Sequence, residues 1–403
     1  MDLVVYAVPL FVLAIFTELI YGVVRGRNTY RLNDAAGSLF MGTLSQARRF
    51  AAVGVGGYVY YLVTAYFSLP LMDASSWLTW VLAFVLYDLC YYWLHRIGHE
   101  RTIFWASHVA HHQSEDYNLS TALRQTSTGF LLGWIFYIPM YFLGIPADVV
   151  ITVGSLNLIY QFWVHSEHIP KLGWYERVFV TASNHRVHHG QNEIYLDRNY
   201  GGVFIGWDKL FGTFQEELDE EPCIYGIRGP LRSFNPVKAN LHIYIDMIRD
   251  CWYTARWQDK LKIWVARTGW RPADVAEIFP REKNDLDTFE KYDPPTSKSV
   301  FWYVLFQLLV VILALNGIAG STFSYYAGLC QWGLMLASAV TAALWLQGYD
   351  ARAILRWELL RLACLFVVLW LGWQSAYNTS TLVILMVYGA INLAVLPLVR
   401  NSQ

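Results

Sequence analysis

Ten of the eleven histidines of this chain lie between residues 95 and 189, in less than a quarter of its 403 residues. They form four groups, and each group contains a pair spaced three or four residues apart. On a helix, such a pair lies on one face with about 5–6 Å between Cβ atoms, so both imidazoles can reach one metal ion. We therefore predict a metal site built from His95, His99, His108, His111, His112, His165, His168, His185, His188 and His189. The remaining histidine, His242, is interpreted as an ordinary surface or core residue.

The number of imidazoles exceeds what one metal ion can use. A zinc ion takes about four ligands, whereas two ions with four or five nitrogens each would use the whole set. Imidazole suits iron, zinc, copper and nickel, and zinc can replace iron during purification. An all-histidine site at a membrane surface favours two irons per chain that activate O₂ to attack a lipid C–H bond. The alternatives are a structural zinc site and a histidine-rich metal transporter. Transport predicts polar residues inside several spans, whereas these histidines lie at span ends and beyond them.

Metal-bound histidines usually donate their second ring N–H to a carboxylate or a carbonyl oxygen. The acids near the four groups that could accept it are Glu100, Asp116, Glu167, Glu193 and Asp197.

The composition predicts an all-α polytopic membrane protein. Hydrophobic residues make up 55% of the chain and charged residues 15%, against about 25% charged in a typical soluble protein. The net charge of −1 argues against a nucleic-acid partner. The five cysteines form no C-x-x-C motif, which argues against a disulfide framework or a thiolate metal site. The bilayer and a lipid substrate are the expected partners.

Apolar runs of roughly 20 residues predict membrane-spanning helices. We expect spans at 4–24, 50–69 and 77–94, a hairpin of two shorter arms at 129–143 and 149–164, and four C-terminal spans near 300–318, 326–346, 354–373 and 379–397. Residues 32–49 are predicted to form an amphipathic surface helix. The expected domains are N-terminal membrane helices (1–76), a catalytic region (77–227), a polar cytosolic segment with a linker (228–298) and a C-terminal four-helix membrane region (299–403).

Basic residues near span ends predict the orientation of the chain. One side of the membrane receives Arg25, Arg27, Arg48, Arg49, Arg96, Arg101, Arg124, Lys171, Arg177, Lys298, Arg352, Arg356 and Arg400. The opposite turns, "GSTFSYY" and "WQSAYN", contain no Lys or Arg. We therefore expect a histidine-rich helical catalytic cap that faces the cytoplasm, in a multi-pass protein of the bacterial inner membrane or the endoplasmic reticulum.

The motifs "HRIGH", "HVAHH" and "HRVHH", in this order, resemble the fatty acid hydroxylase and sterol desaturase superfamily of integral membrane non-haem iron enzymes. The longer stretches "YDLCYYWLHRIGHE", "HHQSEDYNLSTALRQ" and "NHRVHHGQNEIYLDRNYGG" resemble its alkylglycerol monooxygenase branch. The matched positions are the predicted histidine ligands except His168, together with Glu100, which we take as a candidate catalytic residue.

The resemblance implies two irons, O₂ as the oxidant and tetrahydrobiopterin as the electron donor. It also implies hydroxylation of the ether-linked carbon of an alkylglycerol, followed by release of a fatty aldehyde and glycerol. The alternative substrates are a sterol, a fatty acid or a sphingolipid, and the alternative electron donor is a redox protein. The segments "NYGG" and "FGTF" are predicted to form tight turns beneath the site, where glycine permits close backbone approach.

Overall fold

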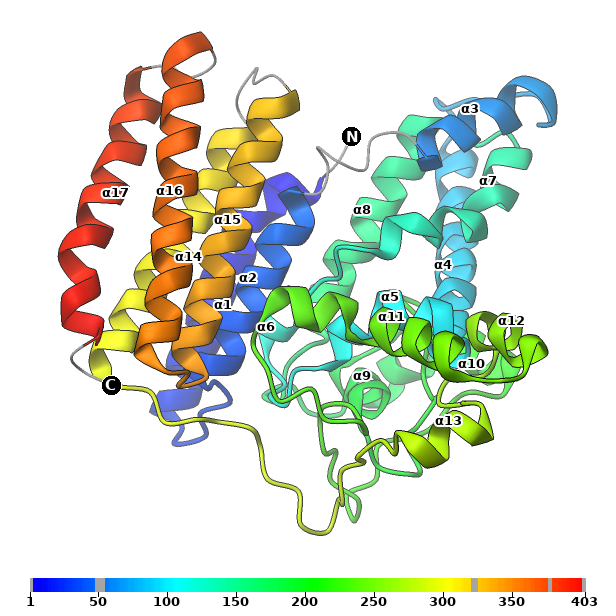
Figure 1. Cartoon of the computed structure of the whole chain (residues 1–403). Helices are drawn as coiled ribbons and strands as arrows, with labels where there is room; N and C mark the ends of the chain where they lie inside the picture. Colours follow the sequence, from blue (N-terminus) through cyan, green and yellow to red (C-terminus); the bar gives the residue numbers. More distant parts are fainter. Residues whose placement is uncertain (1–2, 48–54, 320–324, 376–378, 401–403) are drawn as a thin grey trace. The chain divides into compact units, whose positions relative to one another are not determined.

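The computed structural model describes the chain except residues 1–2, 48–54, 320–324, 376–378 and 401–403 (Figure 1). The described part is helical and contains no β-strand, only isolated β-bridges. The predicted all-α fold is therefore confirmed. The chain divides into a first unit, Met1–Tyr30, Gly54–Leu231 and Asn240–Glu290, and a second unit, Arg31–Val53, Arg232–Ala239 and Lys291–Gln403.

Two long apolar helices, α1 (Val4–Val24) and α4 (Trp77–Glu100), belong to the first unit. Helix α4 packs against α5 (Thr102–His112) and α8 (Ala147–Trp163). It continues past the predicted end of its apolar run at residue 94. Its last two turns therefore carry His95 and His99 on one rigid element.

The predicted hairpin differs from its expected form in the first arm. Residues 129–143 form two short 3₁₀ helices, η2 (Gly129–Leu131) and η3 (Gly133–Tyr137), followed by α7 (Ile138–Phe142). Pro139 has no backbone N–H and cannot extend a helix that begins upstream, but it fits the first turn of α7. The second arm is the continuous helix α8, which ends just before His165.

The rest of the first unit consists mainly of short helices: α3 (Val55–Tyr66), α6 (Leu119–Ala122), η4 (Gly173–Arg177), α9 (Ala182–His189), α10 (Gly206–Phe211), α12 (Trp257–Val265) and α13 (Ala273–Ile278). Helix α11 (Pro236–Tyr253) belongs to this unit from Asn240 onward.

The second unit is a bundle of α2 (Leu32–Ala47), α14 (Lys298–Ala319), α15 (Tyr325–Leu346), α16 (Ala351–Ser375) and α17 (Thr379–Arg400). The last four helices coincide with the four predicted C-terminal runs. The prediction of a surface helix is wrong for α2, because Ala36, Phe40 and Leu44 are buried in the core of the bundle. These residues are spaced four apart, so they form one apolar face, which packs against α14 and α15.

Three stretches of the described residues are long and apolar enough to cross a bilayer: Tyr6–Val24, Trp77–Glu100 and Gly328–Leu346. Helix α1 also exposes large apolar side chains such as Leu10 and Phe16, which are 66% and 57% exposed. These features fit contact with lipid, because water would make such exposure costly.

Candidate metal centre

Four segments of the first unit bring the histidines together. Helix α4 supplies the first two histidines, His95 and His99, and α5 supplies the next three, His108, His111 and His112. His165 follows the C-terminal end of α8, and α9 supplies the last three. Helix α9 has only eight residues, and a reciprocal capping box between Thr181 and Asn184 fixes its start. Eight of the nine converging histidines are buried, and His108 is half-buried.

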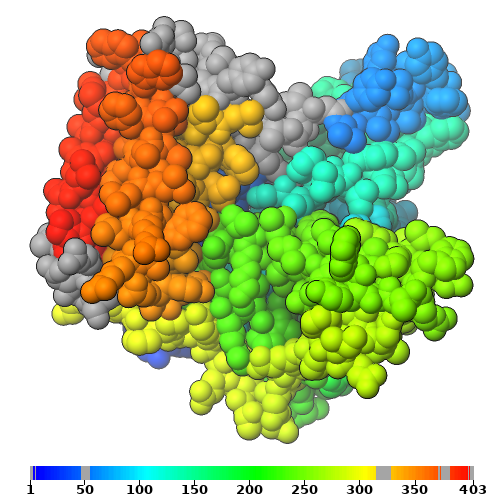
Figure 2. Space-filling view, in the orientation of Figure 1, coloured from blue at the N-terminus to red at the C-terminus, as the bar shows by residue number. Residues whose placement is uncertain are grey.

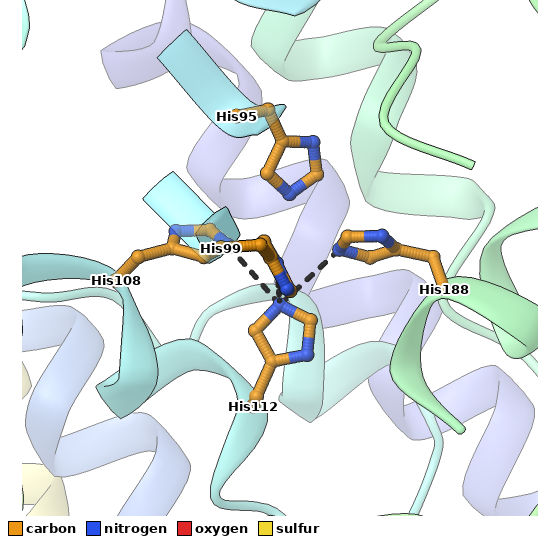
Figure 3. A group of neighbouring side chains, drawn as sticks. All are labelled: His95, His99, His108, His112 and His188. Atoms are coloured by element: carbon orange, nitrogen blue, oxygen red, sulfur yellow. Dashed lines mark hydrogen bonds between the residues drawn. The ribbon is translucent and has the colours of Figure 1, made fainter. Parts of the chain in front are cut away.

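The five-histidine group consists of His95, His99, His108, His112 and His188 (Figure 3). Each member offers one ligand nitrogen, and these nitrogens all lie within 4.8 Å of one another. The Nε2 atom of His112 lies 3.1 Å from that of His99, 3.1 Å from that of His108 and 3.2 Å from that of His188. Figure 3 shows these imidazoles pointing toward a common centre.

The four-histidine group consists of His111, His165, His185 and His189. The Nε2 atom of His165 lies 3.3 Å from that of His111 and 3.0 Å from that of His185. The Nε2 atoms of His185 and His189 are 3.2 Å apart. The two groups are neighbours, since the rings of His112 and His189 stack with centroids 4.3 Å apart. The arrangement is compatible with a dinuclear centre.

Each H-x-x-H-H motif is divided between the two groups. On α5, the histidines four apart, His108 and His112, share one group, while His111 joins the other. On α9, the histidines four apart, His185 and His189, again share one group, the four-histidine group, while His188 joins the five-histidine group. Helical spacing alone allows both i,i+3 and i,i+4 partners, so the sequence could not assign them.

Backbone carbonyl groups orient four of the rings. A carbonyl oxygen can only accept, so the Nδ1 atom of each ring must carry the proton that it donates. In a neutral ring the Nε2 lone pair is then directed inward. The four bonds run from His95 to Tyr200 (2.8 Å), from His111 to Arg124 (3.0 Å), from His165 to Gln161 (2.8 Å) and from His188 to Arg198 (2.9 Å).

This orientation leaves buried nitrogen lone pairs without a hydrogen-bond donor, and a bound metal ion would satisfy them. His111 and His165 both donate through Nδ1, so two lone pairs oppose each other across 3.3 Å. The buried Nε2 atom of His95 has no hydrogen-bond partner among the described residues. Nitrogens bound about 2.0–2.1 Å from an ion lie about 2.8–3.4 Å apart at octahedral or tetrahedral angles, a range that includes the closest Nε2–Nε2 distances in both groups. The residues present therefore fit two metal ions.

Burial keeps these rings neutral and ready to bind. It lowers the pKa of His111 to about 4, and burial beside other histidines lowers the pKa values of His112 and His189 well below the usual range. Neutral imidazole is the form that binds a metal ion, so no proton competes for the ligand nitrogens near neutral pH.

The predicted acidic partners mostly have other roles. Glu100 forms an ion pair with Arg96 at 2.8 Å, and Glu167 and Glu193 pair with other arginines. A carboxylate oxygen of Asp197 lies 3.9 Å from Nδ1 of His99. The catalytic role of Glu100 stays a prediction.

Two carboxylates that the sequence analysis did not single out fix the loop behind His95. Asp208 accepts the backbone N–H groups of Tyr200 and Gly201 at 2.7 and 2.8 Å. Asp88 accepts those of Val203 and Phe204 at 2.9 and 3.0 Å. Burial raises the pKa of Asp208 to about 6. The signal for Asp88 was present, since an acid inside an apolar span marks a structural or functional contact.

The glycines of "NYGG" allow this loop to approach the acids closely. A Cβ atom at Gly201 would lie 2.7 Å from the carbonyl oxygen of Phe204, and one at Gly202 would lie 2.8 Å from a carboxylate oxygen of Asp88. The carbonyl group of Tyr200 can therefore reach His95 only with glycine at these positions.

His168 belongs to neither group. Its ring packs edge-on against Tyr21 at 5.2 Å, and it lines a polar cavity of about 580 Å³. Tyr225 also lines this cavity and stacks on Tyr117, with ring centroids 4.7 Å apart. Tyr117 in turn stacks on His165 at 5.7 Å. A continuous line of rings thus runs from the cavity to the four-histidine group.

Residues 80–213, which include all nine converging histidines, match the model of the fatty acid hydroxylase family. The chain is 41% identical to human alkylglycerol monooxygenase over 343 residues, 83% of this chain and 74% of that protein. It is 37% identical to the Xenopus tropicalis enzyme of the same name, over 77% of this chain and 69% of that protein, and 36% identical to the Danio rerio enzyme, over 77% and 70%. No solved structure matches the chain.

The chain belongs to the alkylglycerol monooxygenase family. It is accordingly a membrane oxidoreductase that acts on lipids and requires a metal and O₂. This confirms the predicted class, the predicted lipid substrate and the need for an electron donor.

Proposed function

We propose that this chain is a di-iron monooxygenase that hydroxylates the ether-linked carbon of alkylglycerols. One oxygen atom of O₂ enters the C–H bond, the other leaves as water, and two electrons and two protons come from a donor. The resulting hemiacetal collapses to a fatty aldehyde and glycerol. The observation that carries the proposal is the pair of adjacent histidine groups, with five and four converging nitrogens. The family relatives favour an alkylglycerol over a sterol, a fatty acid or a sphingolipid.

The protein contributes binding, orientation and exclusion of water. Nine neutral imidazoles would hold two irons without cancelling their charge, and the bound iron pair would reduce O₂ and supply the oxidant. The carbonyl groups of Tyr200, Arg124, Gln161 and Arg198 keep four rings in place. Trp105 lies 5.0 Å from the ring of His99 and covers part of the five-histidine group.

The metal centre and the reaction can be tested together. We expect protein from iron-supplemented cells to contain two irons per chain and to release fatty aldehyde from an alkylglycerol when a reduced donor is present. His188→Ala should lose one iron and the activity. His242→Ala is the matched control, because His242 lies in neither group, and it should retain both. One iron or none in the wild-type protein would contradict the dinuclear centre. Intact iron without aldehyde would instead contradict the substrate.

We further propose that the donor is a reduced pterin that binds in the polar cavity. Side chains of both charges line it, including Lys171, Arg186, Glu167 and Glu217. Such a lining suits a planar heterocycle with adjacent donors and acceptors better than an alkyl chain. Tyr225 offers a ring face, and the stacked rings behind it lead to the four-histidine group. A pterin bound there would supply two electrons.

Calorimetry under anaerobic conditions tests this cavity without depending on turnover. Tetrahydrobiopterin should bind the wild-type protein and bind Tyr225→Leu about 2–10-fold more weakly, because the stacking face is lost. Tyr175→Leu removes a tyrosine outside the cavity and should leave binding unchanged. Equal binding to Tyr225→Leu would place the pterin elsewhere. Absence of binding to the wild-type protein would favour a redox protein as the donor.

We also propose a multi-pass topology with the histidine groups on the cytoplasmic side, supported by the basic residues near the span ends. The linker at 280–298 contains exposed basic residues such as Arg281 and Lys283. Trypsin should cleave it in sealed vesicles whose cytoplasmic face is outward and not in vesicles of the opposite orientation. The reverse pattern would invert the proposed topology.

A further inference from the structure

Helix α11 carries an uncovered apolar stripe in the segment that the sequence predicted to be polar and cytosolic. Leu241, Ile245, Ile248 and Trp252 follow one another at intervals of four, three and four residues, so they share one face. Their exposed fractions are 38%, 57%, 57% and 81%. A soluble helix rarely leaves such a face in water.

Helix α12 repeats the pattern. Trp257, Leu261 and Val265 are spaced four apart, and each is more than 60% exposed. The other side of both helices is already packed, because Met247 and Ile263 are buried against Ala106 of α5. Each helix therefore has two apolar sides, and packing within the first unit covers only one of them. Figure 2 shows α11 and α12, in green, at the molecular surface.

The position of α12 indicates what covers the second side. The backbone N–H of Thr102 donates to the carbonyl of Ala266 at 3.1 Å, and that of Thr268 donates to the carbonyl of Glu100 at 3.2 Å. The first bond joins the C-terminal end of α12 to the first residue of α5, and the second joins a residue just beyond α12 to the last residue of α4, a candidate membrane span. In Figure 1, α11 and α12 run across this end of α4. The apolar stripe of α12 therefore ends beside the C-terminal end of a candidate span.

We propose that the exposed faces of α11 and α12 form an interfacial docking surface that lies in the headgroup region of the bilayer. Amphipathic helices with Trp at the apolar boundary occupy this depth in membranes. Helix α12 also packs against α5, which carries three of the histidines. An amphiphilic lipid could thus pass from the bilayer to the centre without crossing water. The surface rests on the membrane position of α4 and not on the identity of the metal.

Depth-dependent quenching in lipid nanodiscs tests the surface directly. An environment-sensitive fluorescent amino acid would replace Ile248, Trp252 or Leu261, which are all exposed. Nitroxides attached to lipid should quench these probes, and aqueous iodide should not. A probe at Glu277, an exposed residue of α13, should show the reverse. Quenching of the stripe by iodide would overturn the proposal, and protection from both quenchers would assign the face to a second copy or another protein.

A triple variant measures the consequence for lipid uptake. Ile245→Glu, Ile248→Glu and Trp252→Glu together should raise the apparent KM for alkylglycerol in vesicles at least about fivefold, because charge prevents insertion of the stripe. The kcat value should stay unchanged, since none of the three residues belongs to a histidine group. An unchanged KM would overturn the uptake role. The quenching experiment needs no turnover, so it remains decisive even if the proposed reaction is wrong.

Discussion

The two units each bury a polar cluster, but the clusters differ in whether they are complete. In the second unit, Glu358 and Arg361 form an ion pair at 2.7 Å and are at most 1% exposed. Glu358 also accepts from Tyr303 and Trp345, and Arg361 donates to Asn392 at 2.7 Å. Donors meet acceptors and the charges cancel. We call these residues, with Gln307 and Tyr388, the bundle network.

The histidine groups of the first unit have the opposite character. Their inward nitrogens include opposed lone pairs, and His95 offers another without a described partner. Burial of unsatisfied acceptors is unfavourable, so the arrangement requires a cation. The comparison shows that burial of polar groups does not by itself define a functional site. What distinguishes the site is a surplus of buried hydrogen-bond acceptors over donors.

Removal of one ligand should produce the largest effect. His111→Ala deletes a nitrogen of the four-histidine group, and we expect activity to fall by more than about 100-fold, because even outer partners of metal-bound histidines contribute about 10–100-fold. Elemental analysis should show loss of about one iron per chain. Unchanged iron content would show that the four-histidine group holds no iron, as the bundle network holds none.

Breaking the bundle network should instead affect stability. Glu358→Gln leaves Arg361 without its counter-charge, and the free energy of unfolding should fall by about 3–5 kcal/mol. The iron content of the folded protein should not change, since Glu358 belongs to neither histidine group. Adding Arg361→Met to Glu358→Gln should recover part of the loss in thermal unfolding experiments. A double variant less stable than the single one would argue against the ion pair as the cause.

Iron removal should destabilise the protein through the histidine groups. The metal binds the folded state, so iron at about 100 times its Kd should contribute about 2.7 kcal/mol. Chelation followed by calorimetry should show a lower Tm, which iron should restore in the wild-type protein. In the His111→Ala variant, the increase in Tm on addition of iron should be smaller than in the wild-type protein. A Tm insensitive to iron in the wild-type protein would mean that the lone pairs are satisfied in another way.

The smallest effect is expected from the loop that supports His95. Asp208→Asn replaces one acceptor oxygen by a donor facing backbone N–H groups, so the carbonyl of Tyr200 should shift. Iron affinity should fall by about 10–100-fold. Asp219→Asn is the control, because its side chain is 91% exposed. Equal affinity in both variants would show that the carbonyl does not position His95.

Much of this organisation could be predicted from the sequence, because it depends on local patterns. The apolar runs predicted the C-terminal helices, and the crowding of the histidines in the sequence predicted that they converge in space. The partition of each motif could not be predicted, since it depends on how α5 and α9 are rotated about their axes. The same limit applies to the carbonyl partners of the rings, which come from distant segments such as Arg198.

The burial of α2 and the stripe on α11 were missed for a related reason. Both helices are amphipathic, and periodicity shows that one face is apolar without showing what covers it. In α2 that face packs in the bundle core. In α11 one apolar side packs within the first unit and the second stays uncovered. Only the folded chain distinguishes the two outcomes.

The division of each H-x-x-H-H motif has a consequence for how the enzyme acquires its metals. Because α5 and α9 each give ligands to both groups, an ion bound in one group fixes the rotation of both helices and preorganises the other group. Loading should then be cooperative, and half-loaded protein should be scarce at intermediate iron concentrations. The same two short helices would thus act as ligand donors and as the coupling between the two ions, so the first ion bound should raise the affinity for the second.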